Sequence, residues 1–162
     1  RPDAVSRVGD ILAGRFLDKE PDFVVTVETK GIPVAMMTAR ALDCPLVIAR
    51  RDVKSMEGSV VTINYVSASS RSMQAMSLPK RAMPPGKRAL MVDDFMKGGG
   101  TANGVKQLMA EFGASLVGVG VLIATDLPQE KKVQEYTSLF TLYGVDEAEG
   151  RVELHRTRKK SG

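Results

Sequence analysis

Along the chain, short runs of β-branched and aliphatic residues alternate with segments whose apolar residues recur at helical spacing. Val5, Val8, Ile11, Leu12 and Phe16 share one face of a helix, which predicts an amphipathic helix near the start of the chain. The other predicted helices are residues 32–42, 102–112 and, as a short one, 129–135. The runs that predict buried strands are residues 23–27, 45–49, 89–92 and 116–124.

This alternation of strands and helices predicts a mostly parallel sheet with helices on both faces. In such sheets, ligands bind at the edge where the carboxyl ends of the strands meet. The turns after residues 27, 49 and 92 each follow a predicted strand, so we expect all three at that edge. The sequence therefore predicts a single ligand site there.

The middle and the end of the chain have weaker patterns. Residues 59–65 alternate like a half-exposed strand, and residues 67–81 are polar and rich in serine, which predicts a long mobile excursion or a hairpin. Two further segments, 138–143 and 151–154, resemble strands.

The composition describes one ordinary globular domain. The 162 residues are 43% hydrophobic and 26% charged, and no apolar run reaches the roughly 18–20 residues that a membrane helix needs. Cys44 is the only cysteine and His155 the only histidine, which excludes an internal disulfide and disfavours a Cys/His zinc site. A lone cysteine without a signal peptide favours the cytoplasm.

The net charge of +4 owes much to the end of the chain. Four basic residues crowd its last seven positions, namely Arg156, Arg158, Lys159 and Lys160. Such a run is usually a solvated tail, and a weak attraction for phosphate or nucleic acid is the other interpretation. The chain does not begin with Met, from which we expect a fragment of a longer protein.

A glycine-rich turn with the chemistry of a phosphate site follows the strand predicted at 89–92. Gly98, Gly99 and Gly100 let the backbone curl so that successive N–H groups point at one spot. The helix that follows adds unpaired N–H donors and a partial positive charge. Thr101 contributes a hydroxyl and Lys97 a cation. Together these groups predict a cradle for a phosphate.

Two adjacent acids, Asp93 and Asp94, distinguish this turn from other phosphate loops. A carboxylate accepts hydrogen bonds from the paired hydroxyls of a ribose but repels a phosphate, so the segment fits a ligand that carries both. The alternative interpretation is a helix N-cap with a surface acid before a flexible turn. A P-loop needs a Gly-Lys-Ser/Thr triplet that is absent from the chain, and the glycines miss the spacing of a dinucleotide-binding turn.

Residues 92–101, Val-Asp-Asp-Phe-Met-Lys-Gly-Gly-Gly-Thr, resemble the signature with which type I phosphoribosyltransferases bind 5-phosphoribosyl-1-pyrophosphate (PRPP). The resemblance implies an α/β fold of that type: a mostly parallel central sheet flanked by helices, with a flexible hairpin loop and a small C-terminal hood. It implies that residues 1–162 form one PRPP-binding domain. It further implies that the ribose is bound by Asp93 and Asp94, and the 5′-phosphate by Lys97, Gly98, Gly99, Gly100 and Thr101.

The same resemblance assigns the other turns. Residues 28–31, Glu-Thr-Lys-Gly, correspond to the pyrophosphate loop of the family, and the diphosphate contacts implied are Thr29, Lys30, Gly31, Arg50 and Arg51. Solvated strand-end charges are the alternative interpretation of the two arginines. The excursion at 65–81 corresponds to the flexible loop, with Tyr65, Lys80 and Arg81 as candidate contacts. Mg²⁺ is the metal expected to accompany PRPP, and no residue is assigned as its ligand.

Lys97 separates the chain from the 6-oxopurine salvage enzymes of the family, which carry a carboxylate three residues after the second acid. A cation in that place cannot accept the proton of a purine base, so we assign no catalytic residue. With residues 58–67 (Gly-Ser-Val-Val-Thr-Ile-Asn-Tyr-Val-Ser) and 76–81 (Met-Ser-Leu-Pro-Lys-Arg), the turn resembles the purine operon repressors of Gram-positive bacteria.

That second resemblance implies a PRPP-binding effector domain of a transcriptional repressor of purine biosynthesis genes, with PRPP as inducer and no transferase turnover. In those proteins a winged-helix domain, which is not in this sequence, precedes the effector domain and binds operator DNA. The same resemblance implies that guanosine tetraphosphate competes for the site and that the protein is a homodimer. The alternative is a purine phosphoribosyltransferase of the xanthine or adenine type, favoured by the adenine-enzyme-like Glu28, Lys30 and Gly31. A generic nucleotide-binding α/β domain is the third interpretation.

Overall fold

A six-stranded sheet in the order β2-β1-β5-β6-β7-β8 forms the centre of the computed structural model, which describes residues 1–51, 58–67, 71–146 and 148–158. The first five strands in that order run parallel, and β8 pairs antiparallel with β7. A separate antiparallel pair is formed by β3 and β4. The bounds are β1 Phe23–Val27, β2 Leu46–Ala49, β3 Val60–Val66, β4 Met73–Pro79, β5 Arg88–Met96, β6 Ser115–Thr125, β7 Thr137–Asp146 and β8 Arg151–Arg156.

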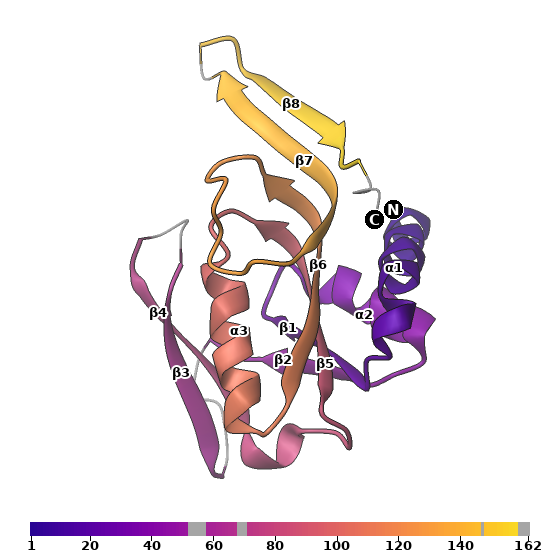
Figure 1. Ribbon diagram of the computed structural model, residues 1–162, viewed down its shortest axis with the longest axis vertical. Coiled ribbons are helices and arrows are strands. Elements are labelled where there is room, and N and C mark those ends of the chain that lie inside the picture. Colours follow the sequence, from indigo (N-terminus) through magenta and orange to yellow (C-terminus); the bar gives the residue numbers. More distant parts are fainter. Residues whose placement is uncertain (52–57, 68–70, 147, 159–162) are drawn as a thin grey trace.

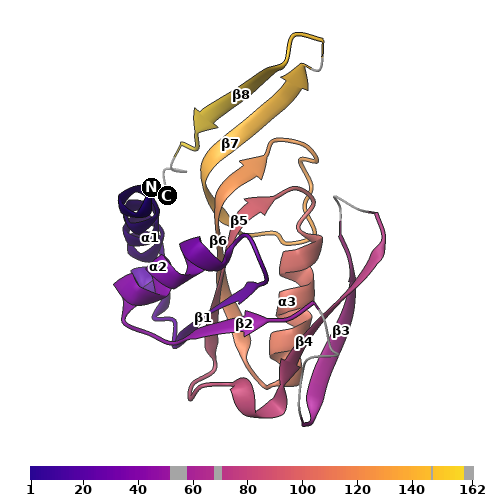
Figure 2. The ribbon, with the colours of Figure 1, turned by 180° about the vertical axis from the view of Figure 1, so that it is seen from behind.

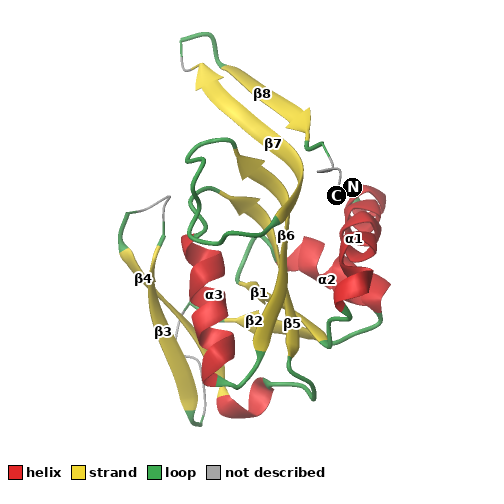
Figure 3. Cartoon of the chain, in the orientation of Figure 1, coloured by secondary structure: helices red, strands yellow, loops and turns green. Residues whose placement is uncertain are grey.

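Helices cover both faces of the sheet (Figures 1 and 2). Helices α1 (Pro2–Phe16) and α2 (Ile32–Leu42) lie on one face, and α3 (Gly100–Glu111) lies on the other, with the β3–β4 hairpin outside it. Two single-turn 3₁₀ helices, η1 (Leu17–Lys19) and η2 (Lys80–Ala82), precede β1 and β5. The mostly parallel central sheet flanked by helices, predicted from the sequence, is confirmed, and Figure 3 shows its layers by element type.

The sheet has a hydrophobic core on each side, as expected for parallel strands covered by helices. Every residue of β1 is buried. Val25 of β1 and Met91 of β5 pack toward α3, whereas Val24 and Leu90 pack toward α1 and α2. This alternation follows from the two-residue repeat of a strand and fixes which side chains of β5 face each helical layer.

The β3–β4 hairpin is fastened to the rest of the molecule at two places. At its end nearer η2, Ser77 and Arg50 exchange backbone hydrogen bonds of 2.8 and 2.9 Å, which join β4 to the end of β2. Along α3, a Cβ at Gly104 would lie 2.8 Å from Met76 Cε and 3.1 Å from the Tyr65 side chain, so glycine permits this close packing. The predicted excursion is therefore a packed hairpin over its described residues.

Two predictions about elements are wrong. Strand β5 continues to Met96 rather than ending at 92, because its pairing with β6 extends through Asp93↔Val121 to Met96↔Ala124. The short helix expected at 129–135 is absent, and residues 126–136 form a loop between β6 and β7. The Lys132 N–H of this loop donates to Gly98 O at 2.8 Å. This hydrogen bond to the glycine-rich turn takes the place of the bond that a helix would make to a carbonyl four residues earlier.

The β7–β8 hairpin projects beyond the other strands and corresponds to the small C-terminal hood (Figure 1). Of the predicted basic tail, Lys159 and Lys160 lie outside the described residues. Within the described part of the chain, no helix combines the length and the apolar character required to cross a membrane.

Candidate functional site

The candidate site is an open cleft of about 640 Å³ at the carboxyl ends of the strands. In the sheet, β1 lies between β2, which follows it in the chain, and β5, which comes much later. The chain therefore changes direction across the sheet between β1 and β5, and the cleft lies at this topological switch point. The cleft is lined by Val27, Glu28, Thr29, Lys30, Arg51, Ser67, Asp93, Asp94, Phe95, Thr101, Leu122 and Ile123. The loop after β1, the acids of β5 and the start of α3 therefore meet as predicted.

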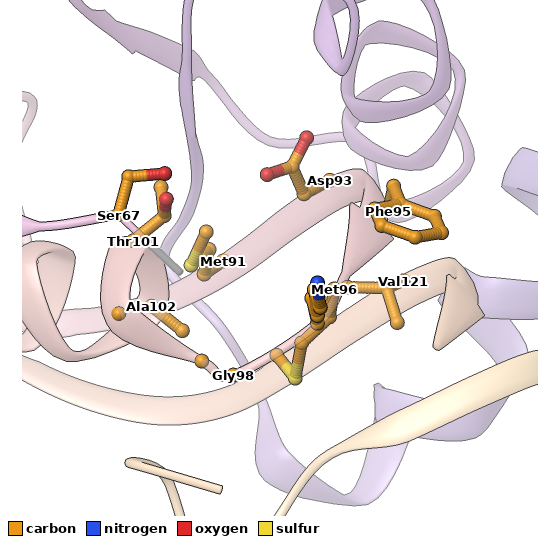
Figure 4. Close-up of a pocket in the computed structure, with 12 residues that line it drawn as sticks. Ser67, Met91, Asp93, Phe95, Met96, Gly98, Thr101, Ala102 and Val121 are labelled. Atoms are coloured by element: carbon orange, nitrogen blue, oxygen red, sulfur yellow. The ribbon is translucent and has the colours of Figure 1, made fainter. Parts of the chain in front are cut away.

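The glycine-rich turn forms a smaller hollow beside this cleft (Figure 4). Residues 97–101 line it, together with Asp93 and Ser67. Gly99 has φ +79°, a left-handed conformation that glycine adopts without strain, and it directly precedes the 12-residue helix α3. In Figure 4 the hydroxyls of Ser67 and Thr101 and the carboxylate of Asp93 lie on the same side of the hollow. The backbone at a helix N-terminus with these polar groups can bind an anion.

The two acids have different surroundings. Asp93 Oδ1 accepts a hydrogen bond of 2.8 Å from the Asp94 backbone N–H, and Asp93 lines both the cleft and the smaller hollow. Asp94 lines the larger cleft. Burial raises the pKa of the Asp93 carboxyl to about 8, the neighbouring Asp94 carboxyl contributes in the same direction, and the Arg51 guanidinium opposes it. Asp93 is thus a carboxyl group whose ionisation is costly until hydrogen-bond donors reach it.

The loop after β1 lies directly against Asp93. A Cβ atom on Gly31 would overlap Asp93 Oδ1 and would come within 3.0 Å of the Thr26 hydroxyl. The Thr26 hydroxyl is buried and has no hydrogen-bond partner among the described residues. The peptide bond between Glu28 and Thr29 is cis. Gly31 therefore belongs to the site through the close approach that it permits, and it also precedes α2.

Glu28 connects the two basic residues after β2 to this loop. Its carboxylate accepts a hydrogen bond of 2.7 Å from the Arg51 backbone N–H and one of 3.2 Å from the Arg50 guanidinium. Arg51 lines the cleft, and its role as a diphosphate contact stays a prediction. Arg50 does not line it in this structure, because its side chain pairs with Glu28 and its backbone pairs with Ser77.

The three residues predicted on the flexible loop do not reach the cleft in this structure. Tyr65 is buried between the hairpin and α3, where its ring packs over Gly104. Strand β4 runs away from the cleft, so Lys80 and Arg81, which follow it, lie at the opposite end of the hairpin. Ser67, at the end of β3, is the described hairpin residue that lines the cleft.

Sequence reasoning missed three contributors. Phe95 continues β5 past the acids and, with Leu122 and Ile123, gives the cleft an apolar wall. Ser67 was hidden in a serine-rich segment without a motif. Lys131, on the loop wrongly predicted as a helix, donates to the Lys97 carbonyl of the glycine-rich turn at 2.6 Å. No motif in its segment indicates such a role.

The chain belongs to the phosphoribosyl transferase domain family, whose model matches residues 1–155. It is 47% identical over 154 residues to the purine biosynthesis transcriptional repressor PurR of Bacillus subtilis, covering 95% of this chain and 54% of that protein. It is 39% identical over 153 residues to the purine biosynthesis transcriptional activator PurR of Lactococcus lactis subsp. lactis, covering 94% of this chain and 56% of that protein.

Enzymes of the family are also similar to the chain. The xanthine phosphoribosyltransferase of an Exiguobacterium species is 37% identical over 123 residues, covering 75% of this chain and 64% of the enzyme. Adenine phosphoribosyltransferase from Thermoanaerobacter pseudethanolicus has the same fold, with a TM-score of 0.74 at 19% identity over 86% of this chain and 81% of that one. The chain spans little more than half the length of the two regulators, so they contain segments without a counterpart here.

Proposed function

We propose that this chain is the PRPP-binding effector domain of a transcriptional regulator of purine biosynthesis genes, and that it performs no phosphoribosyl transfer. The observation that carries the proposal is the 47% identity to a purine biosynthesis repressor over 95% of the chain. The chemical groups of the cleft indicate PRPP as the ligand, and Lys97 of the glycine-rich turn argues against turnover.

We propose PRPP as the ligand because the cleft combines acceptors for ribose hydroxyls with two sets of donors for phosphate groups. Asp93 and Asp94 supply carboxylates for the 2′ and 3′ hydroxyls of the ribose. The backbone of Gly98, Gly99 and Gly100, with Thr101 and Lys97, supplies donors for the 5′-phosphate. Thr29, Lys30 and Arg51, with Gly31 and Arg50 behind them, would supply donors and positive charge for the diphosphate.

Lys97 is the residue that argues against catalysis. It is exposed at the smaller hollow, three residues beyond Asp94. Transfer to an oxopurine requires a group that accepts the proton of the base, and an ammonium group cannot accept one. The same ammonium group attracts an anionic ligand. A lysine where the oxopurine enzymes have a carboxylate therefore suits a protein that binds PRPP and releases it unchanged.

Mg²⁺ is expected to enter with PRPP. No three Cys, His, Asp or Glu side chains gather into a metal-binding cluster in the described part of the chain. The fit is therefore to an ion held mainly by the oxygens of the ligand and by water, as Mg²⁺ commonly is. Asp93 and Asp94 are the side chains of the cleft that would contact this complex. Guanosine tetraphosphate, which also carries diphosphate groups, is a second anion that we propose for the site.

The regulatory step follows from differential affinity. In the whole protein, a winged-helix domain preceding this one would bind operator DNA, and the effector domains would form a homodimer. A ligand that binds one of two conformations more tightly shifts the population toward it. PRPP would also cover Lys30, Arg51 and Lys97 with negative charge, which removes positive potential that DNA phosphates would otherwise meet. We propose that PRPP in this way acts as inducer of a repressor.

Calorimetry with PRPP and Mg²⁺, followed by a pyrophosphate-release assay with a panel of purine bases, tests the effector role. We expect saturable PRPP binding and no steady turnover with any base. Sustained pyrophosphate release with any base would reject the effector role. Operator binding by the full-length protein, measured with and without PRPP over a range of salt concentrations, tests the electrostatic part. A PRPP effect that stays equal at every salt concentration contradicts it.

The second candidate function is a purine phosphoribosyltransferase of the xanthine or adenine type. The 37% identity to a xanthine phosphoribosyltransferase favours it. The apolar wall formed by Phe95, Leu122 and Ile123 also supports it, because such a wall can cover a purine ring. Turnover confined to xanthine or to adenine would establish this function and identify the base.

A further inference from the structure

Lys131 joins three segments of backbone through one side chain. Its ammonium group donates to the carbonyls of Lys97 at 2.6 Å, Thr125 at 2.9 Å and Pro128 at 3.0 Å. An ammonium group has three N–H donors, so each donor has a backbone acceptor. The side chain therefore ties the 126–136 loop to the end of β6 and to the start of the glycine-rich turn.

The surroundings of this ammonium group favour a fixed position. It lies 5.9 Å from the centre of the Tyr136 ring, a distance at which the ring face attracts a cation. Hydrogen bonds from a charged donor are shorter and stronger than those from a neutral one. Lys131 is thus held from several sides, and the carbonyl of Lys97 is held with it.

Fixing these carbonyls orients the N–H groups of the turn. The peptide bonds between Lys97 and Gly98 and between Gly98 and Gly99 are trans, and in a trans peptide the N–H points opposite to the C=O. The Lys97 carbonyl points to Lys131, and the Gly98 carbonyl accepts a hydrogen bond of 2.8 Å from the Lys132 N–H. The N–H groups of Gly98 and Gly99 therefore both point away from the 126–136 loop.

Packing holds the same arrangement. A Cβ at Gly99 would lie 3.3 Å from Lys132 N and 3.3 Å from Val133 Cγ2, and Val133 is buried. The 126–136 loop is thus in close contact with the turn on the side opposite to its N–H groups. Successive N–H groups that point to one side form a concavity that binds an anion.

We infer that Lys131 is a positioning residue for the 5′-phosphate, acting through the Lys97 carbonyl to direct the N–H groups of Gly98 and Gly99 at that phosphate. This inference rests on the proposed PRPP site and adds a determinant that lies outside the signature segment. It makes a selective prediction, because the loop after β1 that faces the diphosphate has no part in the Lys131 contacts.

The test separates the two ends of the ligand by using ribose 5-phosphate and inorganic pyrophosphate as separate probes, beside PRPP, with Mg²⁺ present. Binding is measured by calorimetry for the wild type, Lys131→Met, Lys131→Arg and Lys106→Met. Lys106 is an exposed lysine of α3 outside the cleft, so Lys106→Met removes the same charge without touching the turn. Thermal unfolding of each variant is recorded alongside.

We expect Lys131→Met to weaken the binding of ribose 5-phosphate and PRPP by about tenfold to a hundredfold, by analogy with the loss of a group that orients the ligands of a metal ion, and to leave pyrophosphate binding unchanged. Lys131→Arg should restore part of the loss, and Lys106→Met should match the wild type. Equal weakening of both probes, or no weakening of either, overturns the inference while the PRPP site stands. Wild-type protein that binds no PRPP overturns the proposed function and the inference together.

If the Lys131→Met variant does not fold, an NMR measurement on the wild type still tests the inference. Ribose 5-phosphate should shift the amide NMR resonances of Gly98 and Gly99, because hydrogen bonds to a phosphate change the environment of those N–H groups. Pyrophosphate alone should leave them in place. Resonances of Gly98 and Gly99 that do not respond to ribose 5-phosphate contradict the inference.

Discussion

A Cβ atom on Gly31 would overlap the Asp93 carboxylate, so glycine at this position lets the loop after β1 lie directly against the first acid of β5. The two residues are far apart in the sequence, and their contact brings the predicted diphosphate loop to the predicted ribose acids. The geometry of the cleft depends on this contact.

Gly31→Ala should therefore disturb the cleft. The added methyl group must displace Asp93 or the loop, and such overpacking costs about 1–3 kcal/mol of stability. We expect a lower free energy of unfolding in denaturant titrations and weaker PRPP binding in calorimetry. Gly14→Ala is the control, because nothing lies near its Cβ position on the exposed face of α1. That change should be neutral or stabilise by about 0.5–1 kcal/mol. Equal behaviour of the two variants would disprove the contact.

Asp93 should make the stability of the empty protein fall as pH rises. Its pKa is raised from 3.8 to about 8 in the folded protein, so between these values the folded state binds a proton that the unfolded chain has released. The stabilising contribution is complete below the lower value and is lost as pH rises through the upper one. The slope attributable to one proton is at most about 1.4 kcal/mol per pH unit.

Denaturant unfolding at a series of pH values checks this dependence, with Asp93→Asn as the matched variant. The asparagine has the same shape and does not titrate in this range, so the pH dependence of its stability should be flatter than that of the wild type. Ribose hydroxyls that donate to Asp93 favour its ionised form, so PRPP binding at neutral pH should also release protons. Calorimetry in buffers of different ionisation enthalpy measures that release. A wild type and a variant with parallel pH profiles would contradict the raised pKa.

Asp94→Asn tests the ribose role. A hydrogen bond to a charged group contributes about 1.5–3 kcal/mol, so losing the carboxylate should weaken PRPP by about tenfold to more than a hundredfold. Binding of pyrophosphate, which has no ribose, should persist. Glu111→Gln, at an exposed acid near the end of α3, is the control and should bind PRPP normally. Unchanged PRPP affinity in Asp94→Asn would remove Asp94 from the site.

Tyr65→Phe distinguishes a packing residue from a ligand contact. The Tyr65 hydroxyl is buried without a hydrogen-bond partner in the described part of the chain. An unsatisfied buried polar group costs about 1–3 kcal/mol, so removing the hydroxyl should leave stability unchanged or raise it by up to that amount. PRPP affinity should not change. A clear loss of affinity, without a similar loss in the exposed-ring control Tyr143→Phe, would return Tyr65 to the site.

The fold was predictable because its strands are apolar runs and its first helices have clear periodicity. The length of β5 was not, because Asp93 and Asp94 interrupt the apolar pattern while the backbone continues to pair with β6. The clustering of residues 28–31, 93–94 and 97–101 was predictable, since parallel strands bring their carboxyl ends together. The roles of single residues could not be predicted, because they depend on contacts between segments that are far apart in the sequence. The pairing of Arg50 with Glu28, the direction of β4 that carries Lys80 and Arg81 away, and the three acceptors of Lys131 have no signature in the sequence.

The Arg50–Ser77 bridge and the packing of the hairpin over Gly104 bear on the entropy of binding. Fixing the backbone of one residue costs about 1–2 kcal/mol, so a long excursion that became ordered only on ligand binding would lose much of its interaction energy to that ordering. Here the residues of β3 and β4 are already paired with each other and fastened to β2 and α3. The contacts that order these strands are made within the chain and need no ligand, which leaves more of the interaction energy of the cleft to discriminate one phosphorylated ligand from another.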